Sequence, residues 1–436
     1  MSHSRTNNVR IAGALCALVL SGCTSIRSPR PECGGPAGDA PYCRSPYIES
    51  LTFDWTNGYS EADGSDLWPV TWGADGNVYA FFGDGGGFGG DNRRGRVSFG
   101  VAKMTAPPPL SPATVKNVYG GFQAEHDSTL DGKAGSIIAV GKDFYSIGGL
   151  WNARELAGRR GHKSGAPRRN QLGYSKGNAH SWQATSWSFC TPDSAPGDFC
   201  AGGFINFGRG NRGAPDGYVY LYGVANSSDY WAGDDGPEVA ADEGRSAAAP
   251  AAAPNDSTAN TYLARVSKGH VLQREAYEFF AGLETGGRPA WTRNPQHMKP
   301  VFADRGASLE SASYIPGIRR YIATAQGRYI GQTSFYDAPH PWGPWTTVVY
   351  NNIDPQTGEG GWANLGRAGG GSLGVHIVNA WTSKDGLSLW MTYSSDGQAP
   401  DGALFPPAGT RLDSFNLVPA RLVLRPESLD SRKHDR

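Results

Sequence analysis

The chain has 436 residues, in which 40 lysines and arginines balance 40 aspartates and glutamates. This balance is unlike a general nucleic-acid-binding protein, which carries a basic excess. The 61 glycines and 30 prolines interrupt the chain too often for long amphipathic helices. The 13 tryptophans favour a carbohydrate-binding β protein, because an indole ring covers the apolar face of a sugar, although any single tryptophan is more often a core residue.

The first 22 residues predict a signal peptide. Arg5 and Arg10 precede the apolar run IAGALCALVL, which is too short to span a membrane and ends at SGC. Leu20-Ser21-Gly22-Cys23 is similar to a bacterial lipobox, in which Cys23 becomes the lipidated first residue; the alternative is an ordinary signal peptide cleaved nearby. We therefore expect an extracytoplasmic protein, either lipid-anchored to the outer or plasma membrane of the cell envelope or secreted.

Residues 23–45 are rich in Pro, Gly and Ser and predict a flexible tether, followed by a folded domain over 46–426 and a polar tail over 427–436. Four cysteines remain after the signal and lipidation residues, an even number that suits an oxidising compartment. The simplest pairing joins residues ten positions apart: Cys33 with Cys43, and Cys190 with Cys200. A zinc site is the alternative, but no CxxC spacing supports it.

The domain repeats one phrase five times: an apolar strand, a turn containing Gly or Asp, and a second strand rich in Tyr and small residues. The five turns are expected at Asp75-Gly76, Lys142-Asp143, Asp216-Gly217, Pro316-Gly317 and Asp385-Gly386. A low-complexity Ala/Pro insertion at about 238–260 accounts for the one long interval. Further strands follow each hairpin, so the sequence predicts an all-β five-bladed β-propeller, with a β-sandwich or a right-handed β-helix as alternatives.

The first strand of each propeller blade lines the central channel, so the residues that open these strands converge at one face. Three of the five positions carry ionisable side chains of different kinds: Asp66, Glu310 and His376. The other two are near Ser136 and Asn206. A ligand site is therefore expected at this face.

Asp66 lies nine residues before Asp75 and Asp84 lies nine after it, so folding the first hairpin is expected to bring the two carboxylates side by side. Directly opposed residues have Cβ atoms roughly 4.5–5.5 Å apart, close enough for carboxylates to share protons. Glycosidases use such pairs as acid and base or nucleophile. The alternatives are that Asp84 starts a turn and that Asp66 is a solvated residue at a strand end.

The phrases SDLWPVTWGADGNVYAFFGDG, GPWTTVVY and SKDGLSLWMTYS occur in this order. With them the chain resembles, over about residues 47–424, the family catalogued as domain of unknown function 4185. Members of that family include endo-acting D-arabinanases of glycoside hydrolase family 183, which cut mycobacterial cell-wall arabinan. The resemblance implies an endo-glycosidase acting on arabinogalactan or lipoarabinomannan, in which Asp66 and Asp84 match the paired aspartates of the family's first blade.

We predict Glu310 as proton donor, Asp66 as base and Asp84 as the neighbour that orients Asp66 or tunes its pKa. In a second arrangement Asp66 and Asp84 themselves are nucleophile and acid. Retention and inversion of the anomeric configuration both stay open. A shift of one residue in the hairpin register would change the carboxylate separation from the one that favours retention to the one that favours inversion. Glu310 as an ordinary strand residue is the alternative.

His376 is expected to hold a structural calcium ion through water or to bond the substrate, with a core histidine as the alternative. Trp68, Trp151 and Trp362 are candidate sugar platforms. The basic loop from Arg154 to Arg169 suits an acidic polymer, although a solvated loop is the simpler interpretation.

We expect a monomer that needs no cofactor and binds no nucleic acid. The competing function is a propeller lectin or surface-attachment lipoprotein that binds glycan without cutting it.

Overall fold

The structure is a computed structural model that describes Gly35 and residues 40–152, 169–228, 230, 258–305, 307–326, 333–350, 373–394 and 413–426. All of these belong to one unit, Cys33–Arg436. Strands dominate it, which confirms the predicted all-β class. The short helices are η1 (Trp55–Asn57), η2 (Arg209–Asn211), η4 (Arg274–Ala276), η5 (Pro295–His297) and η7 (Asn379–Trp381). Within these described ranges, no helix has the length and apolar character needed to cross a membrane.

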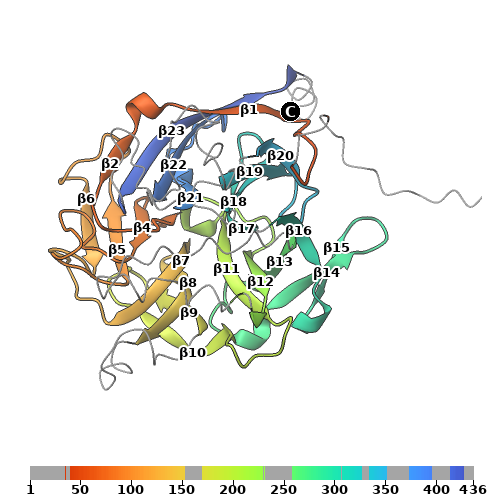
Figure 1. The fold of residues 1–436 in the computed structure, drawn as a ribbon, viewed down its shortest axis with the longest axis horizontal. Coiled ribbons are helices and arrows are strands. Elements are labelled where there is room, and N and C mark those ends of the chain that lie inside the picture. Colours follow the sequence, from red (N-terminus) through yellow and green to blue (C-terminus); the bar gives the residue numbers. More distant parts are fainter. Residues whose placement is uncertain are drawn as a thin grey trace, which may run out of the picture. The chain divides into compact units, whose positions relative to one another are not determined.

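The described strands form five antiparallel groups (Figure 1). Group one contains β3 (Val70–Trp72), β4 (Val78–Phe82), β5 (Gly100–Met104) and β6 (Val115–Tyr119). Group two contains β7 (Leu130–Val140), β8 (Asp143–Asn152), β9 (Asn170–Ser175) and β10 (Gln183–Cys190). Group three contains β11 (Phe199–Asn206), β12 (Tyr218–Ala225), β13 (Thr258–Ser267), β14 (Glu278–Leu283) and β15 (Pro289–Thr292), with β16 (Pro300–Arg305) also paired to β13.

Group four contains β17 (Ser308–Ile315), β18 (Arg320–Gln326), β19 (Thr333–Ala338) and β20 (Thr346–Val349). Group five contains β21 (Leu373–Ile377), β22 (Ser388–Ser394), β23 (Phe415–Leu424) and β1 (Ile48–Phe53), with β2 (Tyr59–Glu61) also paired to β23. Groups three and four join through a short parallel pairing of β11 with β17, so they form one ten-stranded sheet. The five predicted hairpins are confirmed as β3–β4, β7–β8, β11–β12, β17–β18 and β21–β22.

The first strand of each group contacts the next group, and the series returns to group one. Between groups one and two, the Ala139 amide donates to Thr71 Oγ1 over 2.9 Å. Between groups two and three, the Phe204 amide donates to Ser136 Oγ over 2.9 Å. Groups three and four share the β11–β17 pairing.

The remaining two contacts use threonine hydroxyl groups. Thr324 Oγ1 donates to the Val375 carbonyl over 3.0 Å and joins group four to group five. Thr392 Oγ1 donates to the Trp68 carbonyl over 2.9 Å and joins group five to group one. We call β3, β7, β11, β17 and β21 the inner strands; that they line a central channel stays a prediction.

The inner layers are apolar where they contact one another. All five residues of β4, Val-Tyr-Ala-Phe-Phe, are buried. A strand buried on both faces reads as a continuous apolar run rather than as an alternation. The core thus extends between the groups and holds the inner strands in fixed register.

The two ends of the unit meet in group five. β1 pairs with β23, with Ile48 opposite Leu424, and β2 pairs with the start of the same strand, with Tyr59 opposite Leu417. Segments from opposite ends of the chain therefore share one sheet.

The folded unit begins earlier than the predicted boundary at residue 46. The Tyr42 hydroxyl accepts a hydrogen bond from the Ala303 amide over 2.8 Å, and its ring lies 5.2 Å from that of Phe302. The Thr347 amide donates to the Cys43 carbonyl over 2.8 Å. The prediction of a tether that extends to residue 45 was therefore wrong for residues 40–45, because an aromatic side chain in a Pro-rich segment anchors it.

The Cys190–Cys200 disulfide is confirmed, with Cα atoms 5.1 Å apart. Cys43 is also disulfide-bonded. Its predicted partner Cys33 lies outside the described residues, as do the signal peptide, Cys23, the loop over 154–168, the insertion up to residue 257 and the tail over 427–436.

Candidate functional site

Asp66 and Asp84 lie at the same end of the first hairpin, but the predicted register is off by one residue. Val70 pairs with Ala80 and Trp72 with Val78, a register that would place Asp66 opposite Asp84 if it continued. It does not continue, because Leu67 and Trp68 have left-handed φ values of 76° and 58°. Asp66 pairs with Gly83 instead. The prediction of direct opposition was therefore wrong.

A lysine from the next group links the two carboxylates. Lys133 on β7 places its Nζ 2.5 Å from Asp84 Oδ2 and 3.9 Å from Asp66 Oδ2. Arg96 Nη2 lies 3.8 Å from Asp84 Oδ1. The cation between the aspartates offsets the repulsion that two neighbouring carboxylates would feel. Sequence analysis missed Lys133, although it lies three residues before Ser136 on a strand that was expected to line the channel.

Close backbone contacts join the strand that carries Glu310 to β11, and β21 to the residue that follows Asp66. A Cβ added to Gly203 on β11 would lie 1.7 Å from the Glu310 carbonyl oxygen, so the two backbones touch there. A Cβ added to Gly374 on β21 would lie 2.8 Å from the carbonyl oxygen of Leu67, the residue after Asp66.

The hydrogen bond from Thr324 adds to these contacts. Thr324 pairs with Ser311, the residue after Glu310, and bonds the carbonyl of Val375, the residue after Gly374. Backbone contacts thus run from the strand of Glu310 through β21 to Leu67. The convergence of the strand-opening side chains at one face stays a prediction.

Glu310 has the surroundings of a carboxyl group that keeps its proton. It lies on β17 at a register shift between Leu309 and Ser311. Its side chain is partly exposed, but Oε2 is buried and has no hydrogen-bond partner among the described residues. Burial raises the pKa of Glu310 to about 7. Near neutral pH this carboxyl group can donate a proton.

His376 lies on β21, as predicted, two residues beyond Gly374 and opposite Thr392. Its side chain is buried, and burial lowers its pKa to about 3. The imidazole is therefore neutral at physiological pH. The expected water-mediated calcium contact stays a prediction.

The tryptophan predictions have three different outcomes. Trp68 has no exposed surface: its ring stacks on Phe82, and its Nε1 donates to the Ser65 carbonyl over 2.9 Å. Its prediction as a sugar platform was wrong, because the left-handed turn points the ring into the core. Trp151 lies on β8, and the structure describes its backbone only. Trp362 lies outside the described residues, so both stay predictions.

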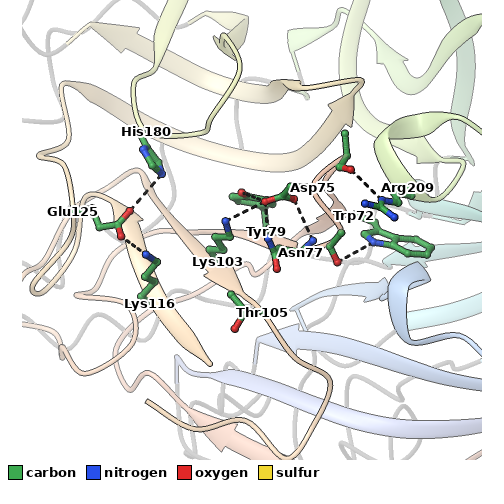
Figure 2. Close-up of polar contacts among 12 residues, drawn as sticks. Trp72, Asp75, Asn77, Tyr79, Lys103, Thr105, Lys116, Glu125, His180 and Arg209 are labelled. Atoms are coloured by element: carbon green, nitrogen blue, oxygen red, sulfur yellow. Dashed lines mark hydrogen bonds and ion pairs between the residues drawn. The ribbon is translucent and has the colours of Figure 1, made fainter. Parts of the chain in front are cut away.

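One histidine-rich group stands apart from the inner strands. Among the described residues, ligand atoms of Glu125, His126 and His180 lie within 4.8 Å of one another. Glu125 contacts Lys116 and lies 3.4 Å from His180 Nε2 (Figure 2). The two imidazole rings are stacked at 4.7 Å and 29°. We assign no metal to this group.

No family model and no curated protein matches the chain. Among solved structures, the chain is similar to the GH43_1 enzyme of Xanthomonas citri at 13% identity and a TM-score of 0.43, over 86% of this chain and 93% of that one. It is similar to RS223 beta-xylosidase at 12% identity and a TM-score of 0.42, over 85% and 96%. It is similar to the alpha-L-arabinofuranosidase PaAbf62A of Podospora anserina at 10% identity and a TM-score of 0.38, over 86% and 96%. All three TM-scores are below 0.5, so we draw nothing about activity from them.

Proposed function

We propose that this protein is a glycoside hydrolase of the endo-D-arabinanase type, which cleaves cell-wall arabinan. The observation that carries the proposal is Glu310: burial raises its pKa to about 7, and it lies on β17, the strand expected to contribute to the channel site with Asp66. A pair of carboxyl groups in unequal environments is what acid and base catalysis of glycoside cleavage requires.

In the proposed reaction Glu310 gives its proton to the glycosidic oxygen as the bond from that oxygen to the anomeric carbon breaks. A water molecule attacks the anomeric carbon and loses a proton to Asp66. Lys133, which contacts both aspartates, keeps Asp66 in place. Asp84 orients this lysine and does not touch the reacting atoms.

The arrangement in which Asp84 is the acid has less support. Its carboxylate is occupied by ion pairs with Lys133 and Arg96. Glu310 has no such partner among the described residues, and burial raises its pKa to about 7.

One observation favours the second candidate function, a glycan-binding propeller without hydrolysis. The Lys133 ammonium group lies 2.5 Å from Asp84, and this contact gives the pair a structural role that needs no catalysis. The raised pKa of Glu310 still favours hydrolysis. An ion pair between Lys133 and Asp84 that is only structural does not require such a carboxyl group on β17.

The proposal includes the architecture and the location. We take the five antiparallel groups as the five blades of a propeller, and the inner strands as the walls of its channel. The signal peptide and Cys23 would place the protein outside the cytoplasm on a lipid anchor; this part is based on the sequence and on the resemblance to the domain of unknown function 4185 family.

Hydrolysis can be tested on the chain from residue 24 onward, which keeps the contacts of Tyr42 and Cys43. It is incubated with mycobacterial arabinogalactan and with plant arabinans, and released oligosaccharides are measured. We expect fragments from the mycobacterial polymer, a rate that falls as the pH rises through about 7, and at least a ~100-fold loss in Glu310→Gln and in Asp66→Asn. Glu49→Gln and Asp193→Asn, at exposed positions, serve as matched controls.

Two results would count against hydrolysis. If no glycan is cut but one binds the parent protein, the glycan-binding function replaces it. If glycan is cut equally well by Glu310→Gln, another residue is the proton donor.

A further inference from the structure

A groove lies between groups one and five, at the other end of β3 from Asp66. Its volume is about 420 Å³. Trp72, the last residue of β3, lines one side, and Trp381 of η7 and Trp390 of β22 line the other. Asp66 precedes β3 and Trp72 ends it. The sugar units bound in this groove would therefore lie apart from the carboxylates.

All three indole rings are partly exposed. The ring of Trp72 is held by a 3.2 Å hydrogen bond from its Nε1 to the Gly76 carbonyl, within the turn that follows β3 (Figure 2). Aromatic faces fixed in this way can stack on the C–H faces of sugar rings without a large loss of side-chain entropy.

The polar groups of the groove are hydroxyl groups. Thr105, Ser383 and Ser388 line it, and Ser388 is exposed at its rim. Thr105 Oγ1 donates to the Thr114 carbonyl over 3.2 Å, which leaves its lone pairs free to accept from a ligand hydroxyl group. Groups of this kind exchange hydrogen bonds with sugar hydroxyl groups.

No lining residue of the groove is charged. Arg209 of η2 lies beside the turn: its Nε donates to the Ala74 carbonyl over 3.0 Å, and it is not among the lining residues (Figure 2). The lining itself therefore offers hydroxyl groups and aromatic faces rather than a charge for an ionic ligand. The volume lies within the range of about 300–1,000 Å³ for small-ligand sites.

We propose that this groove, defined by Trp72, Trp381 and Trp390, is a second binding site for a neutral carbohydrate chain. It is separate from the channel and does not depend on the proposed hydrolysis. Such a site would hold a polysaccharide on the surface of the protein while another part of the same polymer enters the channel.

The test uses affinity electrophoresis of the chain from residue 24 onward, in native gels that contain mycobacterial arabinogalactan, plant arabinan or xylan. Glu310→Gln serves as the background, so that no polymer is cut. We expect at least one neutral polymer to retard migration, and we expect Trp72→Ala to weaken this retardation by about tenfold or more.

Ser388→Arg places a bulky charge at the rim without touching the core and should have the same effect, which guards against a Trp72→Ala variant that fails to fold. Trp55→Ala, at a partly exposed tryptophan of η1, is the matched control and should retain the parent's retardation.

The proposal is overturned if none of the three polymers retards the protein, if both groove variants bind like the background, or if only acidic polygalacturonate, run in a fourth gel, is bound. The two proposals can fail separately. If the protein cuts arabinan but shows no groove-dependent retardation, hydrolysis stands and the groove site is wrong. If it shows groove-dependent retardation but the parent cuts no glycan, the groove site stands and hydrolysis is wrong.

Discussion

Glu310 and Asp84 are two carboxyl groups with opposite surroundings. The buried Oε2 of Glu310 has no partner among the described residues, and burial raises the pKa of this group to about 7. Asp84 contacts two cations, Lys133 and Arg96. The two carboxyl groups thus differ in their partners: Asp84 forms two ion pairs, and Glu310 has the raised pKa that suits a proton donor.

We expect Glu310→Gln to be more stable than the parent protein above pH 7. The pKa of Glu310 in the folded state, about 7, exceeds the 4.5 of an ordinary glutamate. The stability contributed by the neutral carboxyl group is therefore complete below about pH 4.5 and is lost as the pH rises to about 7. The shift corresponds to about 3 kcal/mol at high pH.

Urea unfolding of both proteins at about pH 4 and about pH 8 checks this, with Glu49→Gln at an exposed position of β1 as control. The difference between the parent and Glu310→Gln should be larger at the higher pH. A difference that does not change with pH would mean that folding leaves the pKa of Glu310 unchanged.

We expect Lys133→Met to lower hydrolysis by about tenfold or more, because removing the ammonium group leaves two carboxylates to repel each other. Lys176→Met is the control, since Lys176 pairs with Asp143 over 2.9 Å in an exposed ion pair. A Lys133→Met protein that cuts glycan as fast as the parent would show that this lysine has no part in hydrolysis.

The sequence contains the aspartates of this site but not their arrangement. Counting from Asp75 correctly places Asp66 and Asp84 at one end of the hairpin. The one-residue shift comes from left-handed φ values at Leu67 and Trp68, and nothing in these two side chains indicates such a conformation. Lys133 belongs to the next group, so only the packing of β7 against β3 brings it to the pair.

At the scale of elements, hairpins are predictable and contacts between groups are not. Each hairpin combines apolar strands with a turn that needs Gly or Asp, and this pattern is local. The parallel pairing of β11 with β17 joins strands about a hundred residues apart and leaves no local pattern. Gly203 allows the two strands to approach each other, but in the sequence it is one of 61 glycines and cannot be told from the others.

We expect Gly203→Ala to destabilise the protein by about 3 kcal/mol, since its new Cβ would lie 1.7 Å from the Glu310 carbonyl oxygen and must push β11 from β17. Gly202→Ala is a matched control on the same strand, because its Cβ would meet its nearest atom, the Tyr222 carbonyl oxygen, at 3.5 Å. Urea midpoints of the two variants give the comparison. Equal midpoints would show that β11 and β17 separate without cost.

At the scale of the whole molecule, hydrogen bonds between groups link all five groups in series. The first of them pairs the Ala139 amide with Thr71 Oγ1, and Thr71 is buried. Composition and repeat spacing predict the number of hairpins but not this series. They also do not predict that Tyr42 packs against Phe302 and Tyr336, which are far from it along the chain.

We expect Thr71→Val to cost about 1–3 kcal/mol, because it keeps the side-chain shape but leaves the Ala139 amide buried without an acceptor. Thr52 lies at an exposed position, and its Oγ1 donates to the Arg421 carbonyl over a longer 3.4 Å. Thr52→Val should therefore change the free energy of unfolding by less than about 0.5 kcal/mol. Thermal unfolding monitored by tryptophan fluorescence measures both. A Thr71→Val protein as stable as the parent would show that this contact is dispensable.

The pairing of β1 with β23 also determines when a newly made chain can finish folding. Ile48 meets its partner Leu424 only after nearly the whole chain has left the ribosome, which takes roughly 20 s or more at typical rates of synthesis. Throughout that interval the nascent β1 offers an unpaired edge to any other extended chain nearby. The sheet of group five can therefore be completed only once β23 is available to β1.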